Sequence, residues 1–123
     1  MKLQHYDAFV TLAAVDAEGL IQFYWQLLGR EPQPYIPKVY AEFRLCGLRL
    51  GIFKPRTSHQ QEFAYSASSG MSLCLEVDNL EEAIALFNSL GYPPPGEITT
   101  ASHGREIYAY DAAGNRIILH QSG

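Results

Sequence analysis

Apolar and polar positions along the chain follow one pattern that occurs twice. Residues 10–16 alternate in the manner of a half-buried strand, and residues 19–29 carry apolar side chains three and four positions apart, the spacing of a helix. Residues 73–79 and residues 80–91 repeat the same order. The pattern therefore predicts a strand followed by a helix at two places, each helix packing an apolar stripe into the core.

The predicted helices end alike. Gly29 follows the last apolar position of the first helix, and Gly91 follows that of the second. A glycine at this place takes the left-handed backbone conformation that commonly ends a helix. Pro32 and Pro94 then follow at the same interval. The matching order and spacing indicate that the chain contains two copies of one structural unit.

Each helix is followed by short segments of strict alternation, which predict strands with one face packed against the helix. Each half then has the order strand, helix and three strands, which is an α+β fold class with two βαβββ modules in tandem. The predicted strands after the helices are residues 34–38, 40–45, 48–53, 96–101, 106–110 and 116–120.

The length of 123 residues predicts a single domain, 1–123. Module one is expected over about 5–54, a connecting loop over about 55–70 and module two over about 71–121. The loop is polar and rich in small residues, with Phe63 and Tyr65 as its candidate apolar anchors. Two interpretations stay open for it: a lid over a site, or a plain linker.

Charge and composition exclude some classes of function. The net charge is −4, and the basic residues are scattered along the chain, so nucleic acid is not an expected partner. No apolar run reaches the ~20 residues of a membrane helix, and no secretory signal is evident. Cys46 and Cys74 lie in apolar runs and are expected to be small buried side chains without a disulfide. These features favour a cytoplasmic protein.

The duplicated units resemble the vicinal oxygen chelate superfamily, also called the glyoxalase, bleomycin-resistance and dioxygenase fold. The resemblance rests on Phe9-Val10-Thr11-Leu12 before Asp16, on Leu28-Gly29, on the run from Gly47 to Phe53, and on two stretches of the second half. The second-half stretches are residues 77–83 and residues 111–119, where D-A-A-G-N-R-I-I is similar to the family signature D-P-D-G-N-x-x-E. The resemblance implies that the curved sheets of the two modules pair into a cup, and that the cup is the binding or active site.

Alternation assigns one face of each strand to the helix and the other to the cup. On this basis Leu12, Leu50 and Leu75 face the helices. Glu76 and Glu106 lie on the cup face, and Glu42 is a further candidate for that face. The candidate ligand-binding residues are Phe9, Thr11, Arg49, Gly51, Phe53, Ser72, Tyr108, Tyr110, Arg116, Ile118 and His120.

The resemblance also implies where a metal would bind, since metal-dependent members take one His, Glu or Gln from the first and the last strand of each module. The matching positions in this chain are Phe9, Gly51, Ser72 and Ile118. None of them offers the imidazole, carboxylate or thiolate that a divalent transition metal prefers. We therefore expect no metal at these positions and no cofactor, and the sequence identifies no catalytic residue.

Three functions remain from the sequence. The first is a metal-independent, bleomycin-resistance-like protein that binds a small, aromatic or anionic organic molecule in the cup, with Arg49 or Arg116 pairing with an anionic group. The second is a lyase, isomerase or dioxygenase with a displaced metal site that uses Glu106 or His120. The third is a structural or interaction protein with a filled cup. His5, His59 and His103 are expected to be solvated.

The resemblance further implies a homodimer. The sequence leaves open whether one chain or two form the cup, and it leaves the identity of the ligand open.

Overall fold

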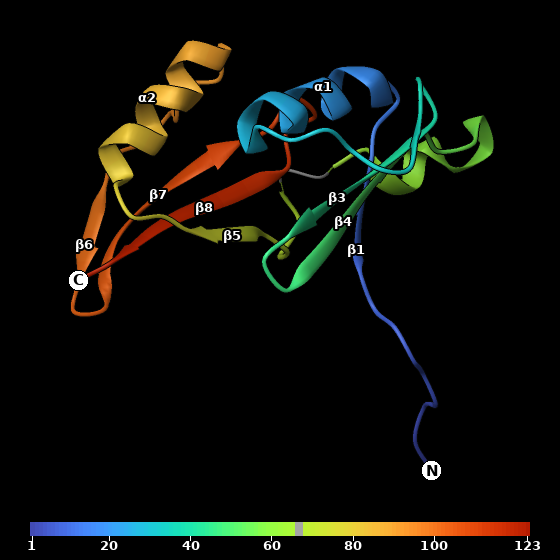
Figure 1. Ribbon diagram of the computed structural model, residues 1–123, viewed down its shortest axis with the longest axis horizontal. Helices are drawn as coiled ribbons and strands as arrows, with labels where there is room; N and C mark the ends of the chain where they lie inside the picture. Colours follow the sequence, from blue (N-terminus) through green and yellow to red (C-terminus); the bar gives the residue numbers. More distant parts are fainter. Residues whose placement is uncertain (66–67) are drawn as a thin grey trace.

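The computed structural model describes residues 1–65 and 68–123, so residues 66 and 67 of the predicted connecting loop lie outside the described residues. Both modules have the predicted order of elements (Figure 1). The first module contains β1 (Val10–Ala13), α1 (Ala17–Leu28), β2 (Tyr35–Ile36), β3 (Tyr40–Leu45) and β4 (Leu48–Phe53). The second contains β5 (Leu73–Glu76), α2 (Leu80–Leu90), β6 (Thr99–Ala101), β7 (Gly104–Tyr110) and β8 (Arg116–Ser122).

The strands form two four-stranded sheets of identical topology. Sheet A has the order β1-β4-β3-β2, and sheet B has the order β5-β8-β7-β6. The first strand of each module is parallel to the last, and the remaining pairs are antiparallel. As a result β1 and β5 are edge strands, each with one side not paired within its own sheet.

The predicted helix ends are confirmed. Asp16 accepts a hydrogen bond from the Gly19 backbone N–H at 3.0 Å, and Asn79 accepts one from that of Glu82 at 3.0 Å. Such side chains satisfy backbone donors that the first turn leaves free. Gly29 has φ 66° and Gly91 has φ 91°, the left-handed conformation at which glycine ends a helix without strain.

The connecting segment is more ordered than the sequence predicted. Residues Thr57–Phe63 form a 3-10 helix, η1, where a loop without secondary structure was expected. Phe63 packs edge-on against Phe53 at the end of β4, with ring centroids 5.6 Å apart. Phe63 therefore anchors the segment to sheet A, as its apolar side chain indicated.

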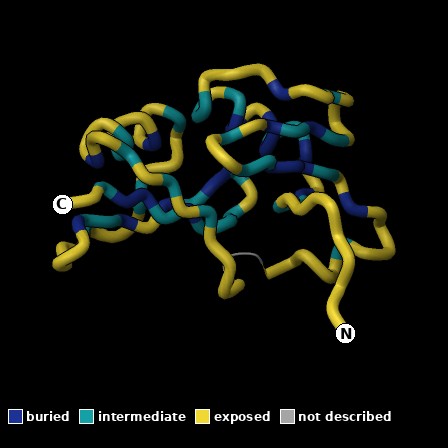
Figure 2. Tube along the Cα trace, turned by 60° about the horizontal axis from the view of Figure 1, so that its bottom comes forward, coloured by how far each residue is buried: buried dark blue, intermediate teal, exposed yellow. Residues whose placement is uncertain are grey.

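Both helices lie on the same side of the sheets, and a shared core joins the modules (Figures 1 and 2). Phe23 of α1 contacts Phe87 of α2 with ring centroids 5.8 Å apart. The hydroxyl of Tyr24, also on α1, donates a 2.6 Å hydrogen bond to the buried carboxylate of Asp111 in the turn between β7 and β8. Burial and the Asp111 charge raise the pKa of Tyr24 well above its usual value, so the hydroxyl keeps its proton.

The helix-free faces of the sheets are more open. In each sheet we call the face opposite the helix the cup face. On sheet A the row Thr11, Gly51 and Glu42 lies on this face, and on sheet B the row Cys74, Ile118 and Tyr108 does so, as strand register requires. The predicted alternation is therefore confirmed for the hairpin strands, whose buried positions face the helices.

No helix within the described residues is long and apolar enough to cross a membrane. The N-terminal residues before β1 extend away from the body of the molecule as an exposed arm (Figure 1).

The bond between Tyr24 and Asp111 predicts a specific loss of stability. Tyr24→Phe removes one donor from a buried carboxylate, and we expect the free energy of unfolding to fall by about 1–3 kcal/mol in urea denaturation. Tyr35→Phe is the matched control. It removes a hydroxyl bonded to Glu18 at the surface, and we expect it to cost about 1 kcal/mol or less. Equal losses in the two variants would contradict the special role of the buried pair.

Candidate functional site

A cavity of about 460 Å³ lies between the edge strands β1 and β5, where the two modules meet. The connecting segment covers it with Phe63, Tyr65 and Met71. Its apolar wall on the sheet side comes from β1, β4 and β5. That wall consists of Val10, Leu12, Ala13, Leu48, Leu50 and Leu73.

Polar side chains line the cavity at a few points. Arg116, at the start of β8, donates from Nε to the Ser72 hydroxyl at 2.7 Å and from Nη2 to the Ser69 carbonyl at 2.6 Å. These bonds fix the guanidinium against the connecting segment. Thr11 faces the cavity from the opposite side, on β1. The cavity thus has mostly apolar walls with a few polar and charged side chains, Arg116 and Glu62 among them, as is common in small-molecule sites.

Only part of the predicted binding set lines this cavity. Thr11, Ser72 and Arg116 do, whereas the other members lie away from its wall. Phe53 lies just behind the wall, in contact with Phe63. The other members are Phe9, Arg49, Gly51, Tyr108, Tyr110, Ile118 and His120, distributed over the cup faces of the two sheets.

Several cavity residues were assigned by sequence to a different environment. Leu12, Leu48 and Leu50 were expected to face the helix, yet they also line the cavity. The reason is that the cavity opens at the edge of sheet A rather than over its cup face. Alternation along a strand separates two faces but carries no information about edges. Phe63 and Tyr65, two aromatic residues in a polar loop, were the signals of the connecting segment in the sequence, and both line the cavity.

On sheet A, Arg49 is already matched by protein carboxylates. Its guanidinium lies 2.8 Å from Asp7 and 3.3 Å from Glu42, and it stacks over the Phe9 ring at 4.2 Å. The hydrogen bond from Arg49 lowers the pKa of Asp7. A ligand anion at Arg49 would therefore compete with these contacts, and the expectation that Arg49 pairs with an anionic ligand stays a prediction. The Arg49 guanidinium and the Phe9 ring form a cation–π contact with each other.

A hydroxyl fills the space beside Gly51. A Cβ atom there would lie 3.2 Å from the Tyr40 hydroxyl oxygen and 3.4 Å from Cγ2 of Thr11. Tyr40 in turn donates a 2.6 Å hydrogen bond to Glu42. Burial, followed by the hydrogen bond to Glu42 and its charge, raises the pKa of Tyr40 to about 12. Tyr40 was not among the candidate residues predicted from the sequence, although its position two residues before Glu42 places it on the same face.

The four family metal positions do not fit a metal. Phe9, Gly51 and Ile118 carry no donor, and the Ser72 hydroxyl accepts the bond from Arg116. The Tyr40 hydroxyl takes the space next to Gly51. A divalent transition metal requires nitrogen, sulfur or carboxylate ligands, so no chemistry is derived from a metal at these positions.

On sheet B, His120 is buried rather than solvent-facing. Its Nδ1 lies 2.7 Å from Glu76, and its Nε2 lies 2.9 Å from Nδ1 of His103. The exposed His103, expected to be only solvated, therefore has a protein partner. Its place in the turn that precedes β7 could have indicated this, because that turn returns next to the end of β8.

Both cysteines differ from expectation. Cys46 and Cys74 are free and exposed, not buried. Cys46 lies at the β3–β4 turn, and Cys74 alternates onto the cup face of sheet B. Partial burial and the charges of Glu76 and Glu106 raise the pKa of the Cys74 thiol, which keeps it protonated and weakly nucleophilic.

No protein-family model and no curated protein matches the chain. Solved structures do. A protein from Agrobacterium tumefaciens is similar with a TM-score of 0.77 and 24% identity over 98% of this chain and 99% of that one. A glyoxalase / bleomycin resistance protein from Catenulispora acidiphila has a TM-score of 0.69 and 20% identity over 97% and 100% of the two chains. A lactoylglutathione lyase from Agrobacterium tumefaciens has a TM-score of 0.67 and 20% identity over 94% and 92%.

These likenesses confirm the predicted fold. The chain has a glyoxalase-like fold, with two βαβββ modules in tandem. At these identities the likeness concerns the fold, so the activity must be argued from the side chains.

The raised pKa of Tyr40 predicts how stability varies at high pH. In the unfolded chain the hydroxyl ionises near pH 10, whereas in the folded chain it ionises near 12. The stability linked to this proton is present below pH 10 and is lost as the pH rises towards 12. We expect Tyr40→Phe to make urea stability fall less steeply over this range than in the unaltered chain. Tyr6→Phe, in the exposed arm, is the control, and an identical slope in Tyr40→Phe and the unaltered chain would contradict the assignment.

Proposed function

We propose that the protein binds a small organic molecule, flat or partly aromatic and anionic, without a metal at the four family positions. The observation that carries this proposal is the cavity between β1 and β5. Its volume of about 460 Å³ is within the range of ~300–1,000 Å³ of small-molecule sites. We place the ligand here, and not across the cup face of a single sheet.

The chemistry of the wall supports an apolar ligand with one charged group. Aliphatic side chains of β1, β4 and β5 form one side, and the Phe63 and Tyr65 rings form another. Such surfaces bind planar rings by dispersion and by exclusion of water. Arg116 supplies a guanidinium at the wall, whose positive charge attracts a carboxylate or phosphate.

Arg116 is a better candidate for the anionic group than Arg49. Arg49 faces Asp7 and Glu42, so a ligand anion there would have to compete with two carboxylates. Arg116 lines the cavity, whereas Arg49 does not, and its hydrogen bonds to the Ser72 hydroxyl and to the Ser69 and Met71 carbonyl oxygens hold its guanidinium there.

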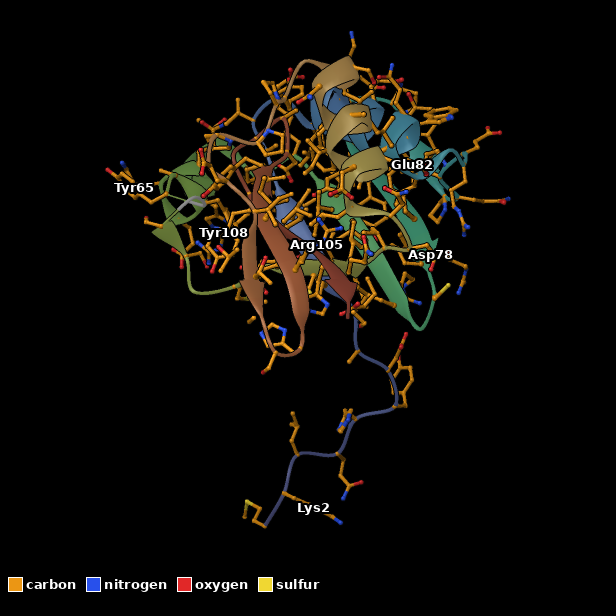
Figure 3. All side chains as sticks on the ribbon, turned by 90° about the vertical axis from the view of Figure 1, so that its left-hand side faces the viewer. Lys2, Tyr65, Asp78, Glu82, Arg105 and Tyr108 are labelled. Atoms are coloured by element: carbon orange, nitrogen blue, oxygen red, sulfur yellow. The ribbon has the colours of Figure 1, made fainter. Side chains whose placement is uncertain are left out.

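The proposal also includes a homodimer and a cytoplasmic location. Phe9 on sheet A and Tyr108 on sheet B are 45% and 49% exposed, although aromatic side chains of this size are commonly covered. Tyr108, labelled in Figure 3, lies on β7 of sheet B. A second copy that covers these faces would complete a cup from two chains. The two free thiols are compatible with a reducing compartment.

The ligand proposal can be tested with the fluorescent probe 1-anilinonaphthalene-8-sulfonate, a planar aromatic anion. We expect saturable binding of one probe per chain, because the cavity joins an apolar wall to Arg116. Thr11→Trp should abolish this binding by filling the cavity from β1. Arg116→Gln should weaken it about tenfold, the equivalent of ~1.4 kcal/mol for one lost charged contact.

Thr99→Trp is the matched control for the bulky substitution. Thr99 is exposed on β6, away from the cavity, and the variant should bind the probe as the unaltered chain does. Circular dichroism verifies that each variant is folded. Binding that persists in Thr11→Trp would show that the probe binds outside this cavity and would contradict the proposed location, whereas no saturable binding at all would support the filled, structural alternative.

The dimer can be tested by sedimentation velocity. We expect the unaltered chain to sediment as a dimer and the double variant Phe9→Asp/Tyr108→Asp as a folded monomer, because two desolvated carboxylates oppose burial of the cup faces. Leu86→Asp changes a comparably exposed apolar residue on α2 and should leave the dimer intact. A monomeric unaltered chain would exclude a cup made from two chains.

A further inference from the structure

Two histidines and a glutamate come together at the far end of sheet B. The ligand atoms of His103, Glu106 and His120 all lie within 4.8 Å of one another. They come from the β6–β7 turn, from β7 and from β8. None of the three residues lines the cavity described above.

Strand register builds most of this cluster. Glu76, His120 and Glu106 form one row across β5, β8 and β7, because Glu76 pairs with His120 and His120 pairs with Glu106. Directly paired residues share a face of the sheet. The backbone then brings His103 back to the row. Gly104 has φ 135° and approaches β8 so closely that a Cβ atom would collide with the Gln121 carbonyl oxygen.

The hydrogen bonds orient the imidazoles. Glu76 accepts from His120 at 2.7 Å, so Nδ1 of His120 carries the proton and Nε2 presents a lone pair. Nδ1 of His103 lies 2.9 Å from that nitrogen, and the two rings are stacked with an interplanar angle of 25°. A carboxylate behind a histidine is the arrangement by which proteins hold metal-binding imidazoles in place.

We propose that His103, Glu106 and His120 form a binding site for one divalent transition-metal ion such as Zn²⁺ or Co²⁺, with Glu76 as the residue that positions His120. Two imidazole nitrogens and a carboxylate are suitable donors for these ions. Nitrogens bound to a tetrahedral Zn²⁺ at ~2.0–2.1 Å are ~3.3 Å apart, so the histidines need to separate by only a few tenths of an ångström.

The ion would replace a proton. Without it, the N–H of one imidazole occupies the space between His103 and His120. On binding, Nδ1 of His103 loses its proton to solvent and offers its lone pair to the metal, and the one proton of the neutral ring is then carried by Nε2, which takes it from solvent if it was not already protonated. His103 is exposed, so water can reach the ion and complete its coordination.

This site is separate from the family positions. His120 lies two residues beyond Ile118, a displacement of ~7 Å at ~3.3 Å per residue along the strand. The proposal does not rest on ligand binding in the cavity. It gives a concrete location to the displaced metal site that the sequence left open as an alternative.

The test uses untagged protein, treated with a chelator and then dialysed. Titration with Co²⁺, followed by visible absorption, and with Zn²⁺, followed by calorimetry, should show one ion per chain. His103→Ala should abolish the absorption bands and the heat of binding, and Glu106→Gln should weaken binding strongly. Glu76→Gln should weaken it about 10–100-fold, since it removes the partner that orients His120 and no ligand.

Matched controls come from the rest of the chain. The double variant His5→Ala/His59→Ala removes the other two histidines, and Cys74→Ser removes the exposed thiol on the same sheet. Both should bind as the unaltered chain does. Because His103 is exposed, His103→Ala should remain folded, which circular dichroism verifies, even if substitution of the buried His120 does not permit folding.

If the unaltered chain shows no saturable binding of Co²⁺ or Zn²⁺, the proposal is overturned. The contact between His103 and His120 is then a hydrogen bond alone. Binding that survives in His103→Ala, or that is lost in either control, would overturn it as well. His103→Ala, Glu106→Gln and Glu76→Gln should bind 1-anilinonaphthalene-8-sulfonate normally, because none of these three residues lines the cavity, so failure of the metal site and failure of the cavity are distinguishable.

Discussion

The packing of α1 against the second module is the constraint on which the rest of the structure depends. Tyr24 reaches from α1 to the buried carboxylate of Asp111, and Phe23 contacts Phe87 of α2. A module of about 60 residues buries only ~60% of its surface alone and is marginally stable. The shared core therefore stabilises both modules, and it also holds β1 near β5, so that the cavity between these edges exists at all.

The three chemically distinct regions follow from this arrangement. The junction of the modules has an apolar cavity with Arg116 at its wall. On the cup face of sheet A, Arg49 forms ion pairs with Asp7 and Glu42. The far end of sheet B carries two imidazoles and two carboxylates in contact. Each region uses the same βαβββ framework, but different side chains at equivalent rows give each its own chemistry.

The two modules share one architecture but carry their polar side chains at different positions along the strands. In sheet A, the Tyr40 hydroxyl occupies the space beside Gly51, and its hydrogen bond gives the Glu42 carboxylate a second partner besides Arg49. In sheet B, His120 lies two positions along β8 from Ile118. A shift of two residues keeps a side chain on the same face, so the strand can relocate a polar site without disturbing the core.

The sequence by itself determined the elements, their order and the faces of the strands, because apolar spacing and the helix-ending Gly29 and Gly91 are local properties. It thereby placed Glu76, Glu106 and His120 on one face, and Thr11, Ser72 and Arg116 among the binding candidates. Only the tertiary structure decided that the cavity opens at the strand edges, that Asp7 and Glu42 engage Arg49, and that the turn before Gly104 brings His103 to His120. These contacts join residues distant in sequence, and their geometry depends on how two modules and a turn pack, which no local pattern encodes.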